Sequence, residues 1–169
     1  MIRRNFPGVG LGVDVHRFGG DGPLVLGGVS VPHPQGLVGH SDADVLCHAI
    51  SDAVLGAAAL GDMGEHFPPH DERWRGASSL ALLRMVAGML PPLGLEVGGV
   101  DATVIAEAPR LGPLRQRMEA SLSEALGLPL GACSVKIKSS DGLGLTGRQE
   151  GMAALAVATV REGPGPTGQ

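Results

Sequence analysis

A strict alternation of residue types over residues 8–16 constrains the fold more than any other feature of the chain. Valine or leucine stands at positions 9, 11, 13 and 15, and glycine, aspartate or histidine stands at positions 10, 12, 14 and 16. A period of two is typical of a half-buried β-strand. It also brings Asp14 and His16 to the same face, about 7 Å apart along the strand. We therefore expect a first strand with one apolar face and one face that carries polar groups.

A second strand is expected over residues 24–31, forming a hairpin-like start with the first. The run Ser41-Asp42-Ala43-Asp44 predicts a helix start with Ser41 as N-cap and an acid at N3, and Gly61 should end that helix after about residue 60. Residues 62–77 show no periodicity, and a loop of this length is usually functional or mobile.

The remaining patterns predict helices over 78–90 and 113–126 and strands over 97–106, 133–138 and 152–160. This order favours a single α+β domain, in which helices pack on one side of a mixed β-sheet. We expect the domain to span residues 1–161, and residues 162–169 to form a disordered tail.

Composition and charge exclude several classes of protein. The net charge is −4, and the chain has one Trp, three Phe and no Tyr. A general polyanion binder needs excess positive charge, and a single-strand nucleic-acid binder needs stacking aromatics, so no nucleic-acid partner is expected.

The sequence contains no stretch of about 18 apolar residues, so a membrane span is not expected. The N-terminus lacks a signal-peptide pattern and there are only two cysteines, which favours a cytoplasmic protein with reduced thiols. Both cysteines, Cys47 and Cys133, are interpreted as small buried apolar residues.

The histidines are concentrated in one part of the chain, because all six lie between residues 16 and 70. Asp14 and His16 on a strand, with His48 on the following helix, offer three protein ligands and leave a fourth position open, which is typical of catalytic zinc. Non-haem iron can use the same ligand set. The alternative is a pair of solvent-facing strand residues and a core histidine. Asp44 and Asp52 share a helix face with His48, and either could accept the second N–H of that imidazole.

Two further segments suit phosphate. His40 and Ser41 precede the helix that carries His48, and a helix N-terminus favours anions, although an ordinary capping serine explains Ser41 as well. The strand end over residues 136–142 combines two lysines, two serines, an aspartate and a glycine, a composition that suits phosphate and a hard cation or else a solvated turn.

Taken together, these motifs resemble the 2-C-methyl-D-erythritol 2,4-cyclodiphosphate synthase family from about residue 9 to 160. The resemblance is carried by the segments Gly12–Phe18, His40–Ala49, Asp52-Ala53, Gly56–Gly64, Phe67-Pro68 and Gly147–Gly151. The resemblance implies a small α+β domain that assembles as a homotrimer with active sites between subunits. It also implies a cytidine diphosphate-linked substrate, whose 2-phosphate attacks the β-phosphate to form a cyclic diphosphate and release CMP.

The resemblance also implies roles for individual residues. Asp14, His16 and His48 would hold Zn²⁺ or another divalent transition metal, and Asp141 would hold Mg²⁺ or Mn²⁺ together with the substrate diphosphate. His40 and Ser139 would stabilise the transition state. The implied substrate contacts are Asp14, His16, His40, Ser41, Asp62, Gly64, Phe67, Asp71, Ala106, Pro109, Arg110, Leu111, Lys138, Ser139, Ser140, Asp141, Leu145 and Arg148.

The chain departs from the usual family pattern at several positions: Arg110 replaces a frequent lysine and keeps its charge, Ser139 stands where threonine is common, and three further departures bear on ligand binding. Pro69 stands where the loop after Phe-Pro usually has an acid, Lys138 replaces a small hydroxyl residue, and Leu145 replaces a phenylalanine that lines an apolar cavity on the trimer axis. Two other functions use the same residues. A metal-dependent phosphohydrolase would release inorganic phosphate, and a metal-stabilised binding trimer would have no turnover.

Overall fold

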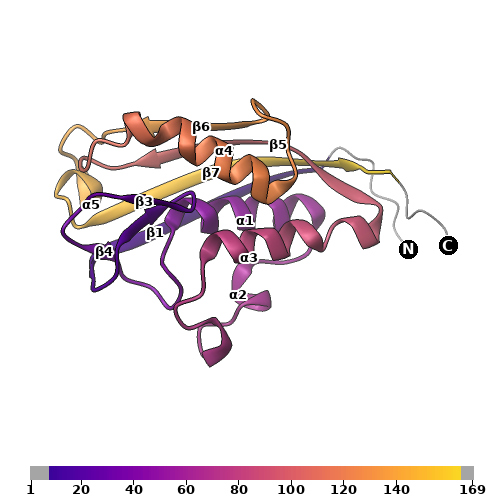
Figure 1. The fold of residues 1–169 in the computed structure, drawn as a ribbon, viewed down its shortest axis with the longest axis horizontal. Helices are drawn as coiled ribbons and strands as arrows, with labels where there is room; N and C mark the ends of the chain where they lie inside the picture. Colours follow the sequence, from indigo (N-terminus) through magenta and orange to yellow (C-terminus); the bar gives the residue numbers. More distant parts are fainter. Residues whose placement is uncertain (1–7, 165–169) are drawn as a thin grey trace.

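The computed structural model describes residues 8–164, which form a five-stranded sheet covered by helices (Figure 1). The sheet contains β1 (Gly8–Gly20), β4 (Gly36–Leu37), β5 (Leu95–Ile105), β6 (Cys133–Lys138) and β7 (Gly151–Glu162), in the order β4-β1-β7-β5-β6. The helices are α1 (Val45–Ala58), α2 (Met63–His66), α3 (Ser79–Gly88), α4 (Arg115–Leu126) and α5 (Gly144–Gly147), with short 3₁₀ turns at Glu72–Trp74, Pro91–Leu93 and Gly112–Leu114.

The sheet is mixed, as the sequence predicted. β7 lies antiparallel between β1 and β5, and β5 pairs parallel with β6. The predicted second strand is wrong in two respects. Residues 24–31 form two strands, β2 (Leu24–Leu26) and β3 (Val29–Val31), and these pair with each other in a separate sheet instead of forming a hairpin with β1. They divide because Gly27 and Gly28 both have positive φ (56° and 72°) and turn the chain between them.

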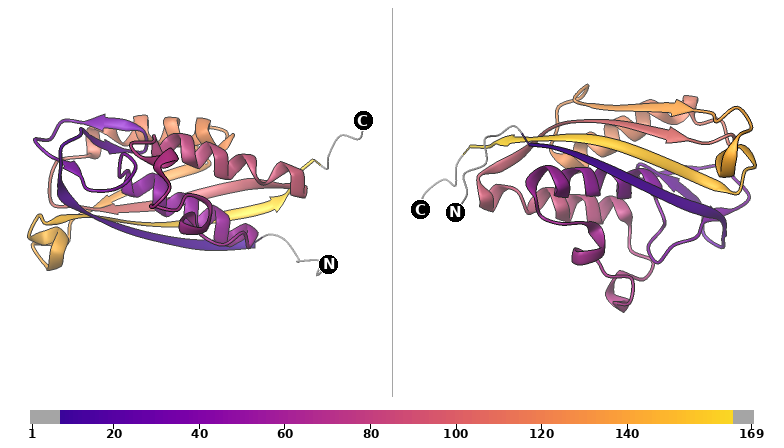
Figure 2. Two further views of the ribbon diagram at one scale, coloured as in Figure 1. Left: turned by 90° about the horizontal axis from the view of Figure 1, so that it is seen from below. Right: turned by 180° about the vertical axis from the view of Figure 1, so that it is seen from behind.

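Helices α1, α3 and α4 lie on one face of the sheet (Figure 2). Helix α1 approaches β1 so closely that two positions of β1 admit only glycine. A Cβ on Gly10 would lie 2.0 Å from the carbonyl oxygen of Ala53, and one on Gly12 would lie 1.9 Å from that of Ala49. The small residues of both elements thus set the distance between helix and sheet, and with it the position of the polar side chains further along β1.

The outer face of β1 carries the apolar half of the alternation. Val9, Leu11, Val13 and Val15 are 67, 65, 52 and 48% exposed, whereas Gly10 and Gly12 are buried. The interpretation of the opening strand as half-buried is therefore right, but the face that packs on the helices of the same chain is the glycine face. Leu155 and Val157 of β7 lie opposite Val13 and Leu11 in the register and extend the same exposed surface.

The ends of the helices follow local capping rules. Asp44, rather than the predicted Ser41, is the N-cap of α1, and its carboxylate accepts from the backbone N–H groups of Leu46 and Cys47. The same buried carboxylate also accepts from Gly27 and Gly28 at 2.9 and 2.7 Å, which ties the β2–β3 turn to the helix. Gly127 ends α4 with φ 68°, as its position in the sequence predicted.

Among residues 8–164, none of the helices combines the length and the apolar character that a membrane crossing requires. Strand β7 runs to Glu162. Of the predicted tail, residues 165–169 lie outside the described part of the chain.

Candidate metal centre and pocket

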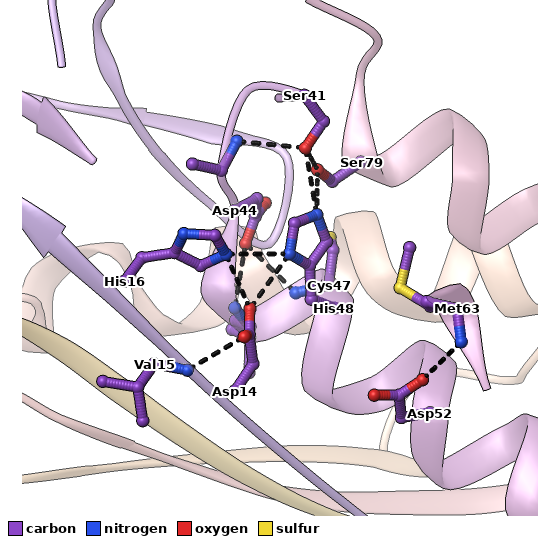
Figure 3. Close-up of polar contacts among 12 residues, drawn as sticks. Asp14, Val15, His16, Ser41, Asp44, Cys47, His48, Asp52, Met63 and Ser79 are labelled. Carbon is purple, nitrogen blue, oxygen red and sulfur yellow. Dashed lines mark hydrogen bonds and ion pairs between the residues drawn. The ribbon is translucent and has the colours of Figure 1, made fainter. Parts of the chain in front are cut away.

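Strand β1 and helix α1 bring Asp14, His16 and His48 together (Figure 3). Asp14 Oδ2 lies 2.9 Å from both His16 Nε2 and His48 Nδ1, and the two ring nitrogens are 3.2 Å apart. A tetrahedral zinc ion with bonds of 2.0–2.2 Å holds its ligand atoms roughly 3.4 Å apart. The three atoms therefore fit a divalent metal with little rearrangement, and a carboxylate with two imidazoles is a donor set that such ions accept.

The pKa values of Asp14 and His16 are both shifted by their surroundings. Burial alone would raise the pKa of Asp14, but hydrogen bonds with His16 and His48 outweigh it and hold the pKa of that carboxyl well below its usual value. Burial alone would lower the pKa of His16, yet the hydrogen bond to Asp14 outweighs burial and raises the pKa. Because the Asp14 carboxylate lies against two imidazole rings, the centre stabilises positive charge, whether as protons on the rings or as a bound metal ion.

The neighbours of His16 fix which of its nitrogens can bind a metal. His16 Nδ1 lies 2.7 Å from the carbonyl oxygen of Val38, and a carbonyl can only accept, so Nδ1 carries the proton and Nε2 presents its lone pair to the centre.

The predicted partner of His48 is wrong, because His48 Nε2 lies 3.0 Å from Ser41 Oγ and 2.8 Å from Ser79 Oγ. Asp44 is instead engaged as a helix cap, and Asp52 accepts from the backbone N–H of Met63 at 2.8 Å.

The three candidate ligands lie in the wall of a pocket of about 340 Å³. Its lining residues are Asp14, His16, His40, Ser41, His48, Asp52, Met63, Gly64, Phe67, Pro69, Trp74 and Leu82. Of the residues that the structure describes, no lysine or arginine belongs to this lining, so the positive charge that the described residues place at the polar end of the pocket comes from histidines and any metal they hold. The other end is apolar, and Phe67 packs edge-on against Trp74 with ring centroids 5.1 Å apart.

Several predicted site residues lie in this pocket or beside it. His40, Ser41, Gly64 and Phe67 line it, and His40 Nε2 lies 3.1 Å from the carbonyl oxygen of Asp71. The Asp71 side chain is directed to Arg73, whose hydrogen bonds lower the pKa of that carboxyl to about 2.

Asp62 is the N-cap of α2, where its carboxylate accepts from Glu65 N at 3.0 Å. It orders the turn that presents Gly64 to the pocket without lining the pocket itself.

The other predicted binding residues form a second cluster, at the ends of β5 and β6. None of Ala106, Pro109, Arg110, Leu111, Lys138, Ser139, Ser140 or Asp141 lines the pocket of the same chain. The two segments are joined by a bond from Ala106 N to the carbonyl oxygen of Lys138 (2.9 Å). Glu107 strengthens the junction, because its Oε1 accepts from the backbone N–H of Ser140 at 2.8 Å and of Gly142 at 3.1 Å. The resemblance implied that these residues complete the site of a neighbouring subunit, and within one chain they lie apart from the pocket.

Leu145 and Arg148 belong to the short helix α5 and its C-cap. Leu145 is 39% exposed, and Arg148 pairs with Glu150 at 2.8 Å. Like the cluster at the strand ends, they lie outside the lining of the pocket.

Sequence reasoning missed four lining residues and one residue behind the pocket. Met63, Pro69, Trp74 and Leu82 complete the apolar wall, and Ser79 contacts His48 from the first turn of α3. The apolar residues carry no pattern that separates them from core residues. Ser78 and Ser79 both stand at the predicted helix start, where either could be the N-cap. The sequence therefore gives no sign that Ser79 contacts His48, since that contact depends on the fold.

The fold and the site define a small α+β protein with a candidate divalent-metal centre at the polar end of a partly apolar pocket, an arrangement typical of a metal-dependent enzyme that acts on a small molecule. The chain belongs to the YgbB family, whose family model matches residues 8–161.

Curated relatives and a solved structure agree with this assignment. The chain is 52% identical over 149 residues to a 2-C-methyl-D-erythritol 2,4-cyclodiphosphate synthase from Aliivibrio salmonicida, covering 88% of this chain and 94% of the relative. It is 53% identical over 150 residues to the enzyme of the same name from Pseudomonas aeruginosa strain UCBPP-PA14, covering 89% and 96%. Its structure is similar to that of a 2C-methyl-D-erythritol-2,4-cyclodiphosphate synthase with CDP bound, with a TM-score of 0.82, 35% identity, and coverage of 90% of this chain and 99% of the other.

Proposed function

We propose that this chain is a 2-C-methyl-D-erythritol 2,4-cyclodiphosphate synthase, a lyase of non-mevalonate isoprenoid biosynthesis. It converts 4-diphosphocytidyl-2-C-methyl-D-erythritol 2-phosphate to the cyclic 2,4-diphosphate and releases CMP. The observation that carries the proposal is the Asp14–His16–His48 centre in the wall of a pocket, in a chain about half identical to enzymes of that name over nearly their whole length.

The reaction needs positive charge and positioning rather than a protein nucleophile. The attacking phosphate and the diphosphate belong to one substrate, so correct folding of the substrate replaces an encounter between two molecules. A divalent metal at the centre, with Zn²⁺ as the first candidate, would act as a Lewis acid on a phosphoryl oxygen. Asp14, His16 and His48 hold that position, and the pocket beside it receives the methylerythritol portion between Gly64, Phe67 and the apolar wall.

His40 and Ser41 are placed to act on the phosphoryl groups. Both line the pocket beside the candidate ligands, and the bond between His40 Nε2 and the backbone of Asp71 holds the imidazole against the loop that closes this side. We assign His40 to stabilising charge on the phosphates in the transition state, and Ser41 to a hydrogen bond with the substrate.

The second cluster would complete the site from a neighbouring subunit. The loop over residues 106–111 would bind the cytidine, while Lys138 to Asp141 would hold the diphosphate together with Mg²⁺ or Mn²⁺ on Asp141. Two observations support a homotrimer with shared sites. The cluster does not line the pocket of its own chain, and the face of β1 and β7 away from the helices exposes a continuous apolar surface.

A product assay tests the proposal. The purified protein is incubated with the cytidine substrate and Mg²⁺, and products are separated by chromatography and identified by mass. We expect CMP and the cyclic diphosphate in equal amounts. Inorganic phosphate in place of CMP would identify a phosphohydrolase instead, and an unchanged substrate with fully metallated protein would contradict any catalytic role.

A further inference from the structure

A chain of polar contacts leads from the metal centre into the protein interior. His48 Nε2, the ring nitrogen that faces away from Asp14, lies 2.8 Å from Ser79 Oγ (Figure 3). Ser79 is fully buried at the start of α3, and its hydroxyl donates a short hydrogen bond to Asp42 Oδ1. The backbone N–H of Ser79 donates to both oxygens of the same carboxylate at 3.1 Å. Asp42 therefore holds the serine by both its main chain and its side chain.

The direction of these hydrogen bonds follows from counting protons. An ionised carboxylate can only accept, so the proton of the Ser79 hydroxyl points to Asp42. The oxygen of that hydroxyl then has only lone pairs left for His48, and Nε2 must be the donor. A neutral imidazole with its proton on Nε2 presents a lone pair at Nδ1, the nitrogen that lies 2.9 Å from Asp14 and faces the centre.

We propose that Ser79 is a positioning residue for the metal ligand His48: together with Asp42 it fixes the tautomer and the orientation in which Nδ1 can bind the ion. Carboxylates commonly do this for metal-bound histidines by direct contact. Here a serine hydroxyl stands between carboxylate and imidazole. The inference rests on the proposed function only in taking His48 as a metal ligand.

Ser41 also lies near His48 Nε2, but its role differs from that of Ser79. Its Oγ is 3.0 Å from His48 Nε2 and 3.0 Å from Ser79 Oγ, and it accepts from the backbone N–H of Ala43 at 3.2 Å. Within residues 8–164 no carboxylate accepts its hydroxyl proton, and Ser41 lines the pocket while Ser79 does not. Ser41 can therefore turn toward a substrate, whereas Ser79 stays with His48.

Metal affinity measured without substrate separates these roles. Zinc binding to the full-length protein is measured by competition with a chromophoric chelator, and the geometry is read from the visible spectrum of the Co²⁺ form. We expect Ser79→Ala to weaken zinc about 10- to 100-fold, the usual effect of losing such a partner. Ser79→Thr keeps the hydroxyl and should bind zinc close to wild type, with an unchanged Co²⁺ spectrum.

Two serine variants serve as controls. Ser51 is another fully buried serine, and its hydroxyl has no hydrogen-bond partner among residues 8–164, so Ser51→Ala should leave zinc affinity unchanged. Ser41→Ala should retain zinc affinity and raise KM for the cytidine substrate. Circular dichroism of each variant checks that the fold is kept.

The outcomes separate this inference from the proposed function. Wild-type zinc affinity in Ser79→Ala, equal losses in Ser79→Ala and Ser41→Ala, or a Ser79→Thr variant as weak as Ser79→Ala would each overturn the role of Ser79. Because zinc binding needs no substrate, failure to release CMP would count against the proposed function and leave this inference standing.

Discussion

At the scale of the residue, His48 joins the two elements of the candidate metal centre. It is the one candidate ligand supplied by α1, and in the described part of the chain no lysine or arginine lines the pocket to replace a lost metal. We expect His48→Ala to abolish tight zinc binding and to lower turnover at least about 1,000-fold, since Lewis-acid stabilisation contributes several kcal/mol. Metal analysis of the purified variant, with steady-state rates of CMP release, checks this.

The His48→Ala variant should keep its fold, because the imidazole is partly exposed and its hydrogen bonds are with polar side chains rather than with the apolar core. His33→Ala is a suitable control, since His33 stacks on Phe18 away from the pocket. Full zinc occupancy in His48→Ala would refute the assignment of this ligand.

Lys138 provides a second test at this scale. It is the last residue of β6, exposed and next to Ser139. If it contacts the substrate diphosphate from a neighbouring subunit, Lys138→Thr should raise KM about fivefold, the upper end for an exposed ion pair of about 1 kcal/mol. Added salt screens exposed charges, so the KM of the variant should also respond less to ionic strength than that of the wild type.

Lys136→Thr removes the same charge from the same strand and is the matched control. Lys136 pairs with Asp101 at 2.5 Å, so we expect its loss to leave KM and the salt response unchanged. Equal behaviour of the Lys138 and Lys136 variants would show that Lys138 has no part in binding.

At the scale of the element, the packing of α1 on β1 depends on residues without side chains. A Cβ on Gly12 would meet the backbone of α1 at 1.9 Å, and a helix backbone cannot turn aside as a flexible side chain can. We expect Gly12→Ala to lower the free energy of unfolding by about 3 kcal/mol or more, at or above the upper end for overpacking. Thermal or urea unfolding followed by circular dichroism measures the change.

Gly56→Ala tests the same contact from the helix side. A Cβ there would lie 4.0 Å from Gly10 Cα, which is ordinary contact, and alanine is favoured over glycine inside a helix. This variant should be stabilised by about 0.5–1 kcal/mol. A loss of stability as large as that of Gly12→Ala would show that α1 is packed differently.

The same contact explains how far the sequence could predict the elements. Strand β6 and the end of α4 at Gly127 follow from local patterns, and the structure confirms both. The alternation in β1 predicts a strand but not which face meets the helices, because an apolar face can be covered by the same chain or by another. Asp44 has the same ambiguity, since a buried carboxylate near a helix start can cap the helix or serve the site. These choices depend on long-range packing that local patterns do not contain.

At the scale of the whole molecule, the candidate site separates into a predictable and an unpredictable part. Asp14 and His16 share a face because a strand has a period of two, and His48 follows from a histidine near the start of the next helix. The contact of the Ser79 hydroxyl with His48 depends on the placement of α3. Under the proposed function, the part played by the strand-end cluster depends on the assembly of several chains. The expectation of a homotrimer came from the resemblance to a family, because the sequence pattern of one chain does not specify how many copies assemble.

The exposed apolar face of β1 and β7 makes the assembly testable. Six apolar side chains on adjacent strands, each 38–67% exposed, form one surface in the free chain: Val9, Leu11, Val13, Val15, Leu155 and Val157. Such surfaces usually mark an interface with another protein. We expect the wild type to behave in light scattering as a trimer, with three times the 17.1 kDa mass of the chain.

Val13→Glu would place a charge at the middle of this face, where burial in an interface would leave it unpaired. We expect the variant to dissociate to monomers and to lose CMP release, because the strand-end cluster of a neighbour would no longer reach the pocket. It should keep wild-type zinc affinity, since Asp14, His16 and His48 come from one chain. Leu130→Glu, at a residue 82% exposed and outside this face, should remain trimeric and active. A monomeric wild type, or an active monomer of Val13→Glu, would show that one chain suffices and that the strand-end cluster has another purpose.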